Sequence, residues 1–348
     1  MEIVALDLAD DGPVAACYAV RENAERADDP FGAPASLRAF RASLTSGWGS
    51  GPAETWYVPD GDGIVAGWYR IEFPDLENRD RAEVDIVVDP ARRRRGLGAA
   101  MLRHAAGRAA AGGRETLSGM VQDDSAGAAF ALRAGATLGI ADVRRVQDLA
   151  RLPAEVVTRL RESAAAAAAG YSLVRWVGIT PEERIDQVAA LHEALNDSPR
   201  DASVEPTAWT PDRIRGRMND RIARSPLRRY SLAAVLNDTG LNDTGLSDTG
   251  HDGAGEMAAL TVVSVDPDVP AWGHQLITAV TRAHRGHRLG LLTKVAMLDW
   301  LAAAEPRLEH IETWNAGSNQ HMIAINESLG YAARGQFRSA ELPVTAAG

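Results

Sequence analysis

The sequence predicts two similar α/β folds in tandem, each a mixed, mostly antiparallel sheet flanked by helices. The first observation is a strand, a glycine turn and a helix in succession, at 82–88, 93–98 and 99–111. The second is a similar succession 192 residues further on, which ends with a helix at 289–304. The third is the length of 348 residues, enough for two domains with cores of their own. A repeat at that spacing indicates two copies of one fold and not a solenoid.

The first glycine turn has the features of an anion-binding site. It runs from Arg93 to Ala99 and follows a strand in which apolar and polar residues alternate. A helix that begins at such a turn directs its unpaired N–H groups and the positive end of its dipole at one place. The neighbouring arginines add charge that suits phosphate. The turn therefore predicts a site for a phosphate-bearing ligand.

The spacing Arg93-x-x-Gly96-x-Gly98, three residues after Pro90, resembles the pyrophosphate-binding turn of the GNAT acyltransferases. These enzymes move an acyl group from coenzyme A to an amine. The second copy keeps the frame but has Arg288 where the first has Gly96. The resemblance implies two GNAT folds on one chain, a tandem layout similar to that of mycothiol synthase, with acetyl-CoA (coenzyme A) as the cofactor.

The resemblance also implies which residues hold the cofactor. In this family the strand before the turn offers backbone N–H groups to the acyl carbonyl, although the valines of that strand also fit a plain core strand. Polar amides at the end of a later strand suit the pantetheine arm. The implied cofactor-binding residues are Val87, Val88, Arg93, Arg94, Arg95, Gly96, Leu97, Gly98 and Ala99 in the first copy and Ala279, Val280, Arg285, Gly286, His287, Arg288, Leu289, Gly290, Leu291, Asn315 and Asn319 in the second.

Four residues are candidates for catalysis. A tyrosine often protonates the leaving thiolate in this family, but the matching positions here are Ala131 and Asn326. A thiolate is already a tolerable leaving group near neutral pH, and Asn326 either donates a hydrogen bond there or is a helix-surface amide. Glu83 and Asp85 share one face of their strand, and either could act as the general base; the alternative is that this face is simply solvated. In the second copy the candidate is Glu312, preferred over nearby histidines.

The sequence also predicts the domain boundaries. We expect an N-terminal domain at 1–150, a linker helix at 151–170 that spaces the halves, and a C-terminal domain at 171–348. Residues 237–256 contain a five-residue repeat rich in Asn, Asp, Thr and Gly. This segment lacks the acidic closing ligand of an EF-hand loop, so we expect a low-complexity insertion at a hairpin and no metal site.

Composition limits the partners. The net charge of −10 argues against a nucleic-acid binder, and no stretch has the length and apolarity of a signal peptide or a membrane span. We therefore expect a cytoplasmic protein with no membrane partner, either a monomer or a homodimer. Its richness in Arg and Ala suggests a GC-rich, actinobacterial genome. Cys17 is far from both turns in sequence and is not proposed as a nucleophile.

These observations predict an acetyl-CoA-dependent N-acetyltransferase. We expect direct transfer in a ternary complex to a primary amine of a small molecule, such as an aminosugar, an antibiotic or an amino-acid derivative. By resemblance to mycothiol synthase, the second copy would carry the chemistry. The alternative is a non-catalytic acyl-CoA sensor or scaffold in which one or both copies are inactive, because neither copy has the tyrosine.

Overall fold

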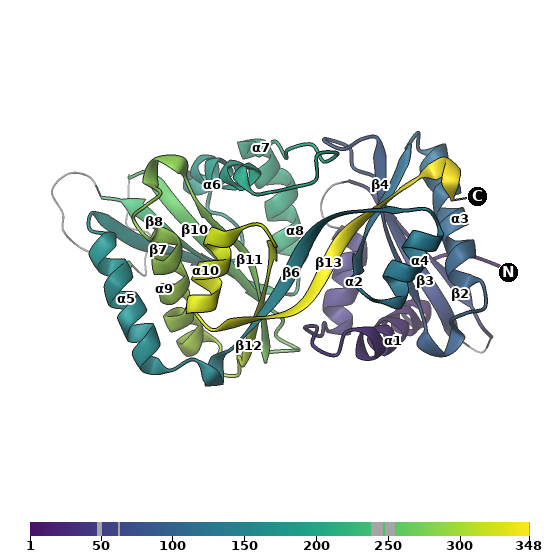
Figure 1. Cartoon of the computed structure of the whole chain (residues 1–348), viewed down its shortest axis with the longest axis horizontal. Helices are drawn as coiled ribbons and strands as arrows, with labels where there is room; N and C mark the ends of the chain where they lie inside the picture. Colours follow the sequence, from purple (N-terminus) through teal and green to yellow (C-terminus); the bar gives the residue numbers. More distant parts are fainter. Residues whose placement is uncertain (47–50, 62, 238–245, 248–254, 348) are drawn as a thin grey trace. The chain divides into compact units, whose positions relative to one another are not determined.

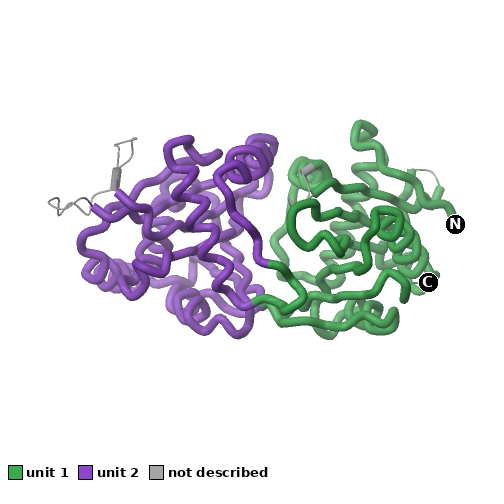
Figure 2. Tube along the Cα trace, turned by 90° about the horizontal axis from the view of Figure 1, so that it is seen from above, with its two compact units in different colours: residues 1–142, 200–205, 335–348 green, residues 143–199, 206–334 purple. Residues whose placement is uncertain are grey.

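The computed structural model describes the whole chain except residues 47–50, 62, 238–245, 248–254 and 348 (Figure 1). The chain forms two compact units (Figure 2). Unit 1 contains residues 1–142, 200–205 and 335–348, and unit 2 contains residues 143–199 and 206–334. These units exchange short segments, so they do not follow the predicted domains 1–150 and 171–348, which remain a prediction about where the two sequence copies meet.

Unit 1 has a mixed sheet between two pairs of helices. Its elements are β1 (Val4–Ala5), α1 (Asp11–Asp28), α2 (Leu37–Ser46), β2 (Ala53–Pro59), β3 (Val65–Glu72), β4 (Arg81–Val88), α3 (Leu97–Ala111), β5 (Thr116–Gln122) and α4 (Ala126–Arg133). The strands are antiparallel except β4 and β5, which are parallel. Met101 of α3 packs on one face of the sheet, while Val14 of α1 and Phe40 of α2 pack on the other.

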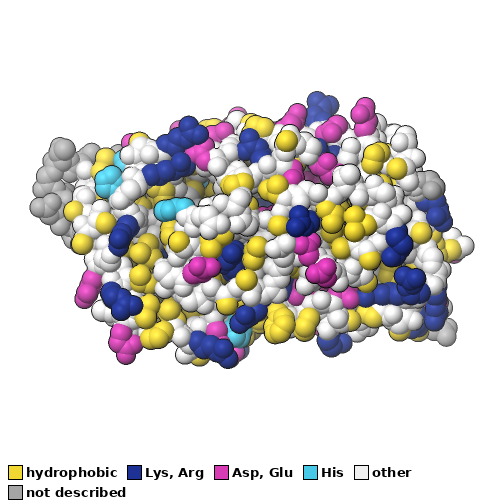
Figure 3. Space-filling model, in the orientation of Figure 1, with side chains coloured by type: hydrophobic (Ala, Val, Ile, Leu, Met, Phe, Trp, Pro, Cys, Tyr) yellow, Lys and Arg dark blue, Asp and Glu magenta, His cyan; other side chains and the backbone are white. Residues whose placement is uncertain are grey.

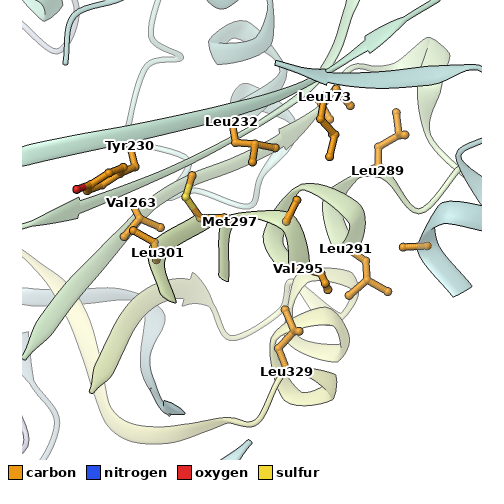
Figure 4. Packing of buried hydrophobic residues seen from close by; sticks show 14 of the residues in the cluster. Leu173, Tyr230, Leu232, Val263, Leu289, Leu291, Val295, Met297, Leu301 and Leu329 are labelled. Atoms are coloured by element: carbon orange, nitrogen blue, oxygen red, sulfur yellow. The ribbon is translucent and has the colours of Figure 1, made fainter. Parts of the chain in front are cut away.

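Unit 2 repeats this plan. Its elements are α5 (Ala154–Ala167), β7 (Tyr171–Val177), α6 (Ile185–Glu193), α7 (Pro211–Arg213), α8 (Asn219–Arg224), β8 (Arg228–Leu236), β9 (Leu246–Ser247), β10 (Met257–Val265), β11 (Trp272–Val280), α9 (Leu289–Ala304), β12 (His310–Ala316) and α10 (Gln320–Ser328). β11 and β12 form the parallel pair. Val295, Met297 and Leu301 of α9 pack against Leu232 of β8 and Val263 of β10 (Figure 4). The mixed, mostly antiparallel strand pairing within each unit confirms the predicted fold class.

The last strand, β13 (Tyr331–Pro343), is divided between the units. Tyr331 lies in the core of unit 2, whereas Phe337–Pro343 pair with Gln122–Thr116 of β5 in unit 1. Leu342 joins the apolar core of unit 1. The larger part of this strand therefore completes the sheet of unit 1, although it lies within the predicted C-terminal domain at 171–348.

The first half makes the reciprocal contribution through β6 (Thr137–Asp148), a single long strand where we predicted closing strands. Its residues from Val143 on belong to unit 2. There the Gln147 side chain donates from Nε2 to the Leu329 carbonyl over 2.7 Å, and both groups are buried. Each unit thus contains a strand segment from the other half of the sequence.

The predicted linker helix packs into a core. α5 packs against α9, with Ala164 and Ala168 in the main apolar cluster of unit 2. The alanine run that suggested a linker gives α5 a face without bulky side chains, and such a face lets two helices approach closely. The prediction that this helix spaces the halves stays a prediction.

A short segment at 200–205 also belongs to unit 1. The Ile140 N–H donates to Asp201 over 2.8 Å, Arg81 donates to the Ser203 carbonyl over 2.7 Å, and the Glu205 N–H donates to the Asn78 side chain over 2.8 Å. These hydrogen bonds join polar residues of loops, which show no hydrophobic periodicity in the sequence. They were therefore not predictable from it.

Replacing Leu342 with Ala tests the divided strand. The side chain is 4% exposed within the core of unit 1, so its truncation should cost about 2–5 kcal/mol. We expect amides of β4 and β5 to lose hydrogen-exchange protection while amides of β10 and β11 keep theirs. Protection lost first in β10 and β11 would contradict the assignment of this strand segment to unit 1.

Candidate functional site

The two glycine turns have left-handed residues at the same two positions, but glycine and arginine occupy these positions in opposite order. In unit 1, Arg94 (φ 64°) and Gly96 (φ 81°) are both left-handed. In unit 2 the equivalent positions, 192 residues on, are Gly286 (φ 91°) and Arg288 (φ 54°). Each turn therefore places one glycine and one arginine in a conformation that costs a non-glycine residue about 1–2 kcal/mol. Arg288 does not relax the backbone requirement of the second turn, because it adopts the left-handed conformation itself.

Both turns leave helix amides available to an anion. α3 begins after Gly96 and α9 after Arg288, and neither helix start has a side-chain cap. A Cβ added at Gly96 or at Gly286 would meet nothing within 4 Å, so the space over each turn is open. Arg94 is exposed beside the first turn. These features fit a phosphate group held by N–H donors.

The leading arginine of each turn is already engaged by protein. The Arg93 guanidinium makes a bidentate ion pair with Asp28 at the end of α1, at 2.6 and 2.7 Å, and donates to the Val88 carbonyl. Arg285 likewise reaches Asp197 over 2.6 Å. Both side chains tie their turn to the end of an earlier helix, and the role that we predicted for both arginines as cofactor ligands stays a prediction. Exposed Arg94 and Arg95, for which the described residues provide no ion pair, are better placed for phosphate.

Asp197 is the ion-pair partner of the second turn, a role that the sequence did not predict. Its carboxylate accepts from Arg282 and from Arg285, and these hydrogen bonds hold its pKa well below the usual range. The only signal for it was the polar run at 196–199 after the first helix of the second half. Position alone could not identify an ion-pair partner 88 residues away.

The remaining residues of the turns have packing roles. Gly98 faces the Phe130 ring of α4, and Gly290 faces Thr278 and Ile325. Leu289 is fully buried. His287 lies against the Tyr171 ring, with ring centroids 5.6 Å apart, and Arg288 donates to Ser163 of α5. The predicted cofactor residues Leu97, Ala99 and Leu291 lie in the first turns of α3 and α9.

The parallel strands before the turns separate early in both units. β4 pairs with β5 only from Arg81 to Glu83, although it continues to Val88. β11 pairs with β12 only from Trp272 to Gln275. Beyond these residues the strand edge of β4 and β11 is open, and it includes the predicted N–H groups of Val87, Val88, Ala279 and Val280. An extended ligand that begins at the turn can pair along this edge.

In unit 1 a carboxylate lies where the strands separate. Val84 and Ile86 of β4 pack toward α3, so Glu83 and Asp85 share the opposite face, as predicted, and this face is toward α1. The Asp85 side chain is accessible to solvent, yet surrounding protein raises the pKa of its carboxyl against the opposing charges of Arg21 and Arg70. A raised pKa brings a carboxylate closer to the range a general base uses.

The equivalent face of unit 2 is apolar. Ile277 and Ala279 of β11 belong to a cluster that packs against α6. Glu312 lies at the closed end of the strand pair, where its carboxylate is 2.9 Å from Nδ1 of His274. We predicted Glu312 as the base of this copy. The pair with His274 was visible in sequence only as two titratable residues on neighbouring strands.

The predicted amides of unit 2 bind one another. Asn326 of α10 is fully buried and donates from Nδ2 to Oδ1 of Asn315 over 2.6 Å. Oδ1 of Asn326 has no partner among the described residues. Asn319 caps α10 by accepting from the Met322 N–H. The alternative that Asn326 is a helix-surface amide is therefore wrong, and its role as a donor to the thiolate stays a prediction.

A buried lysine at the same place was missed altogether. Lys294 of α9, the one lysine of the sequence, is 3% exposed and donates to Gln275 of β11 over 3.1 Å. Its ammonium lies 5.0 Å from the centre of the Tyr331 ring. Burial lowers the pKa of Lys294 to about 7. The sequence did not predict this burial, because a single lysine on an apolar helix normally extends its ammonium group to solvent.

Other classes of site find little support. Within the described residues, no three His, Cys, Asp or Glu side chains are grouped so that they could hold a metal ion, and no helix could cross a membrane. The repeat at 237–256, where we considered a calcium site, falls mostly outside the described residues. On the face in Figure 3, basic and acidic side chains are interspersed, so that face has no broad basic surface for nucleic acid.

Replacing Lys294 with Met should change the pH dependence of stability. Below pH 7 the amine is protonated in both the folded and the unfolded state. The buried charge then lowers the free energy of unfolding by its full amount, on the order of a few kcal/mol. Between pH 7 and 10.5 only the unfolded state stays protonated, so wild-type stability relative to the variant should rise with pH. Urea unfolding at pH 6 and pH 9 measures this, and a difference independent of pH would contradict the burial of a titrating amine.

The comparisons with known proteins agree with this geometry. Residues 20–135 match the model of the acetyltransferase (GNAT) family. A tandem GNAT protein from the clavulanic acid biosynthesis pathway is 29% identical, with a TM-score of 0.78 over 99% of this chain and 98% of that one. A GCN5-related N-acetyltransferase from Sphaerobacter thermophilus is 15% identical, with a TM-score of 0.61 over 99% and 95%. A search of curated proteins finds no significant relative. Residues 20–135 thus match a GNAT acetyltransferase domain, and the whole chain is similar in fold to a protein with two GNAT domains in tandem.

Proposed function

We propose that the protein is an N-acetyltransferase that transfers acetyl from acetyl-CoA directly to a primary amine of a small molecule, and that unit 1 performs the transfer. The observation that carries the proposal is Asp85: an accessible carboxylate with a raised pKa, on the open part of β4, facing α1. Unit 2 has apolar residues at the equivalent positions. This choice of unit departs from the sequence-based expectation, which favoured the second copy.

The residues of unit 1 divide the work. GNAT folds generally bind acetyl-CoA, which supplies the acyl group as a thioester. The uncapped N–H groups of α3, with Arg94 and Arg95, would hold its phosphates. The open N–H groups of β4 near Val87 and Val88 would orient the acyl carbonyl and stabilise negative charge on its oxygen. Asp85 would accept the proton that the acceptor amine loses as it attacks.

The acceptor is proposed to be cationic before it reacts. Amines of aminosugars, antibiotics or amino-acid derivatives are protonated at neutral pH, and the net charge of −10 favours their approach. A carboxylate at Asp85 attracts the ammonium form and then accepts its proton. For unit 2 we propose that acyl-CoA binds without acyl transfer. The alternative of a non-catalytic acyl-CoA sensor or scaffold would then hold for this unit alone.

Replacing Asp85 with Asn tests the base. The amide cannot accept a proton, so kcat/KM for amine acetylation should fall about 10²–10⁴-fold. Because the pKa of Asp85 is raised, wild-type kcat/KM should fall as the pH drops through that pKa, at a higher pH than for an ordinary aspartate. The variant should lose this limb of the profile, and Asp85→Glu should recover part of the rate.

The matching variant in unit 2 decides between the units. Glu312→Gln removes the candidate base of that unit and should leave turnover within about twofold. If Glu312→Gln abolishes turnover while Asp85→Asn does not, the chemistry belongs to unit 2.

The turn arginines should separate by role. Arg95→Ala removes an exposed cation and should weaken acetyl-CoA binding to unit 1 several-fold, with a smaller dependence on salt. Arg93→Ala breaks the ion pair with Asp28, so it should resemble Asp28→Asn in both affinity and stability. Calorimetric titration measures both. If Arg93→Ala matches Arg95→Ala and differs from Asp28→Asn, Arg93 contacts the cofactor after all.

A further inference from the structure

Lys294 lies at the vertex where the strands of unit 2 separate. Gln275, its hydrogen-bond partner, forms with Thr313 the last residue pair between β11 and β12. Thr313 also donates from its hydroxyl to the Gln275 carbonyl at 3.5 Å. The open edge of β11 begins at the next residue. The lysine amine is thus held on the residue that ends the strand pairing.

The hydrogen bonding of this amine is incomplete. An ammonium has three N–H donors, and here one reaches Gln275 while the Tyr331 ring faces the group. Within the described part of the chain, no carboxylate pairs with it. A fully buried amine with one oxygen partner is costly, since buried charges are normally paired and fully hydrogen-bonded. Such a group has donor capacity for an oxygen that another molecule brings.

Gln275 connects the lysine to the backbone of β11. The register between β10 and β11 shifts at this point: Val262 pairs with Ile277 and Val263 with Gln275, so Leu276 is an extra residue in a bulge. From Nε2, the Gln275 side chain donates to the carbonyls of Val262 and Ile277, each over 2.8 Å. It therefore satisfies the carbonyls around the bulge, and Lys294 fixes the other end of the same amide.

Unit 1 lacks this arrangement. The register between β3 and β4 is continuous, without a bulge. The position equivalent to Lys294 is Leu102, which packs in the apolar core with Val84 of β4. At the vertex, unit 2 therefore has a hydrogen-bonded lysine and glutamine where unit 1 has Leu102 and Glu83. A hydrogen-bonded pair at the place where the strand edge opens indicates a role in what binds there.

We propose that Lys294 is a positioning residue of an acyl-CoA site in unit 2. Through Gln275 it fixes the bulge that sets where β11 offers its N–H groups. The environment of its amine changes when an acyl thioester occupies the open strand edge. This inference rests on the proposed function for the binding of acyl-CoA at the second turn, and it does not depend on catalysis by unit 1.

The single lysine makes the test direct. In full-length protein labelled with ¹³C,¹⁵N-lysine, all side-chain lysine signals belong to Lys294. Acetyl-CoA is titrated into two variants that place a carboxylate at equivalent positions of the turns, Gly96→Glu for unit 1 and Arg288→Glu for unit 2. We expect a saturable shift of the Lys294 signal in Gly96→Glu and no shift in Arg288→Glu.

A second measurement separates positioning from general stability. In the Gly96→Glu background, Lys294→Met should weaken acetyl-CoA binding at least fivefold by calorimetry. In the Arg288→Glu background the same substitution should leave the affinity of unit 1 unchanged. Leu102→Met is the matched control at the equivalent position, and it should leave the affinity of unit 2 and the Lys294 signal unchanged.

Two results would overturn the inference. A lysine signal that does not move although calorimetry counts a bound acetyl-CoA in unit 2 would place Lys294 outside the site. Absence of any binding in Gly96→Glu would mean that unit 2 has no acyl-CoA site to position. In both cases turnover that depends on Asp85 would still stand, so the failure of this inference differs from the failure of the proposed function.

Discussion

Both units depend on a parallel pair of strands that separates after only a few residues. β4 leaves β5 after Glu83, and β11 leaves β12 after Gln275. Separation opens a row of backbone N–H and C=O groups inside a sheet, where such groups need a partner. An acyl-pantetheine arm is extended and carries amides, so it fits this edge. The helix that follows each strand adds donors for phosphate at the far end, and the proposed binding of a long, phosphorylated thioester rests on this one constraint.

The two turns show how far the sequence of such a site can drift while its backbone is kept. Each turn needs two left-handed residues, two positions apart, and each has one glycine and one arginine there in opposite order. A pattern written only in glycines would reject the second turn because of Arg288. The physical requirement is the conformation, and an arginine that adopts it at about 1–2 kcal/mol satisfies the same requirement.

The sequence predicted well what is local and poorly what is distant. Strand alternation, glycine turns and helix stops located α9 at 289–304 and β4 at 82–88, because hydrophobic period and caps act within a few residues. The exchange of β13 was not predictable, since the pairing of Phe337 with Gln122 leaves no mark on either segment alone. The same holds for the site. The turns were recognised, whereas the ion pair of Arg93 with Asp28 and the burial of Lys294 depend on tertiary contacts.

A single bulge explains how two copies of one fold can differ in chemistry. Side chains alternate along a strand, so one extra residue reverses the face of the residues before it. In β4, without a bulge, Glu83 faces α1, on the side of Asp85. In β11 the bulge at Leu276 turns the equivalent Gln275 toward α9, where Lys294 meets it. In unit 1 the polar residue at the vertex lies on the face toward α1, where we propose that the acceptor amine binds. In unit 2 it lies on the opposite face, toward α9. The face toward α6 is therefore apolar and has no base.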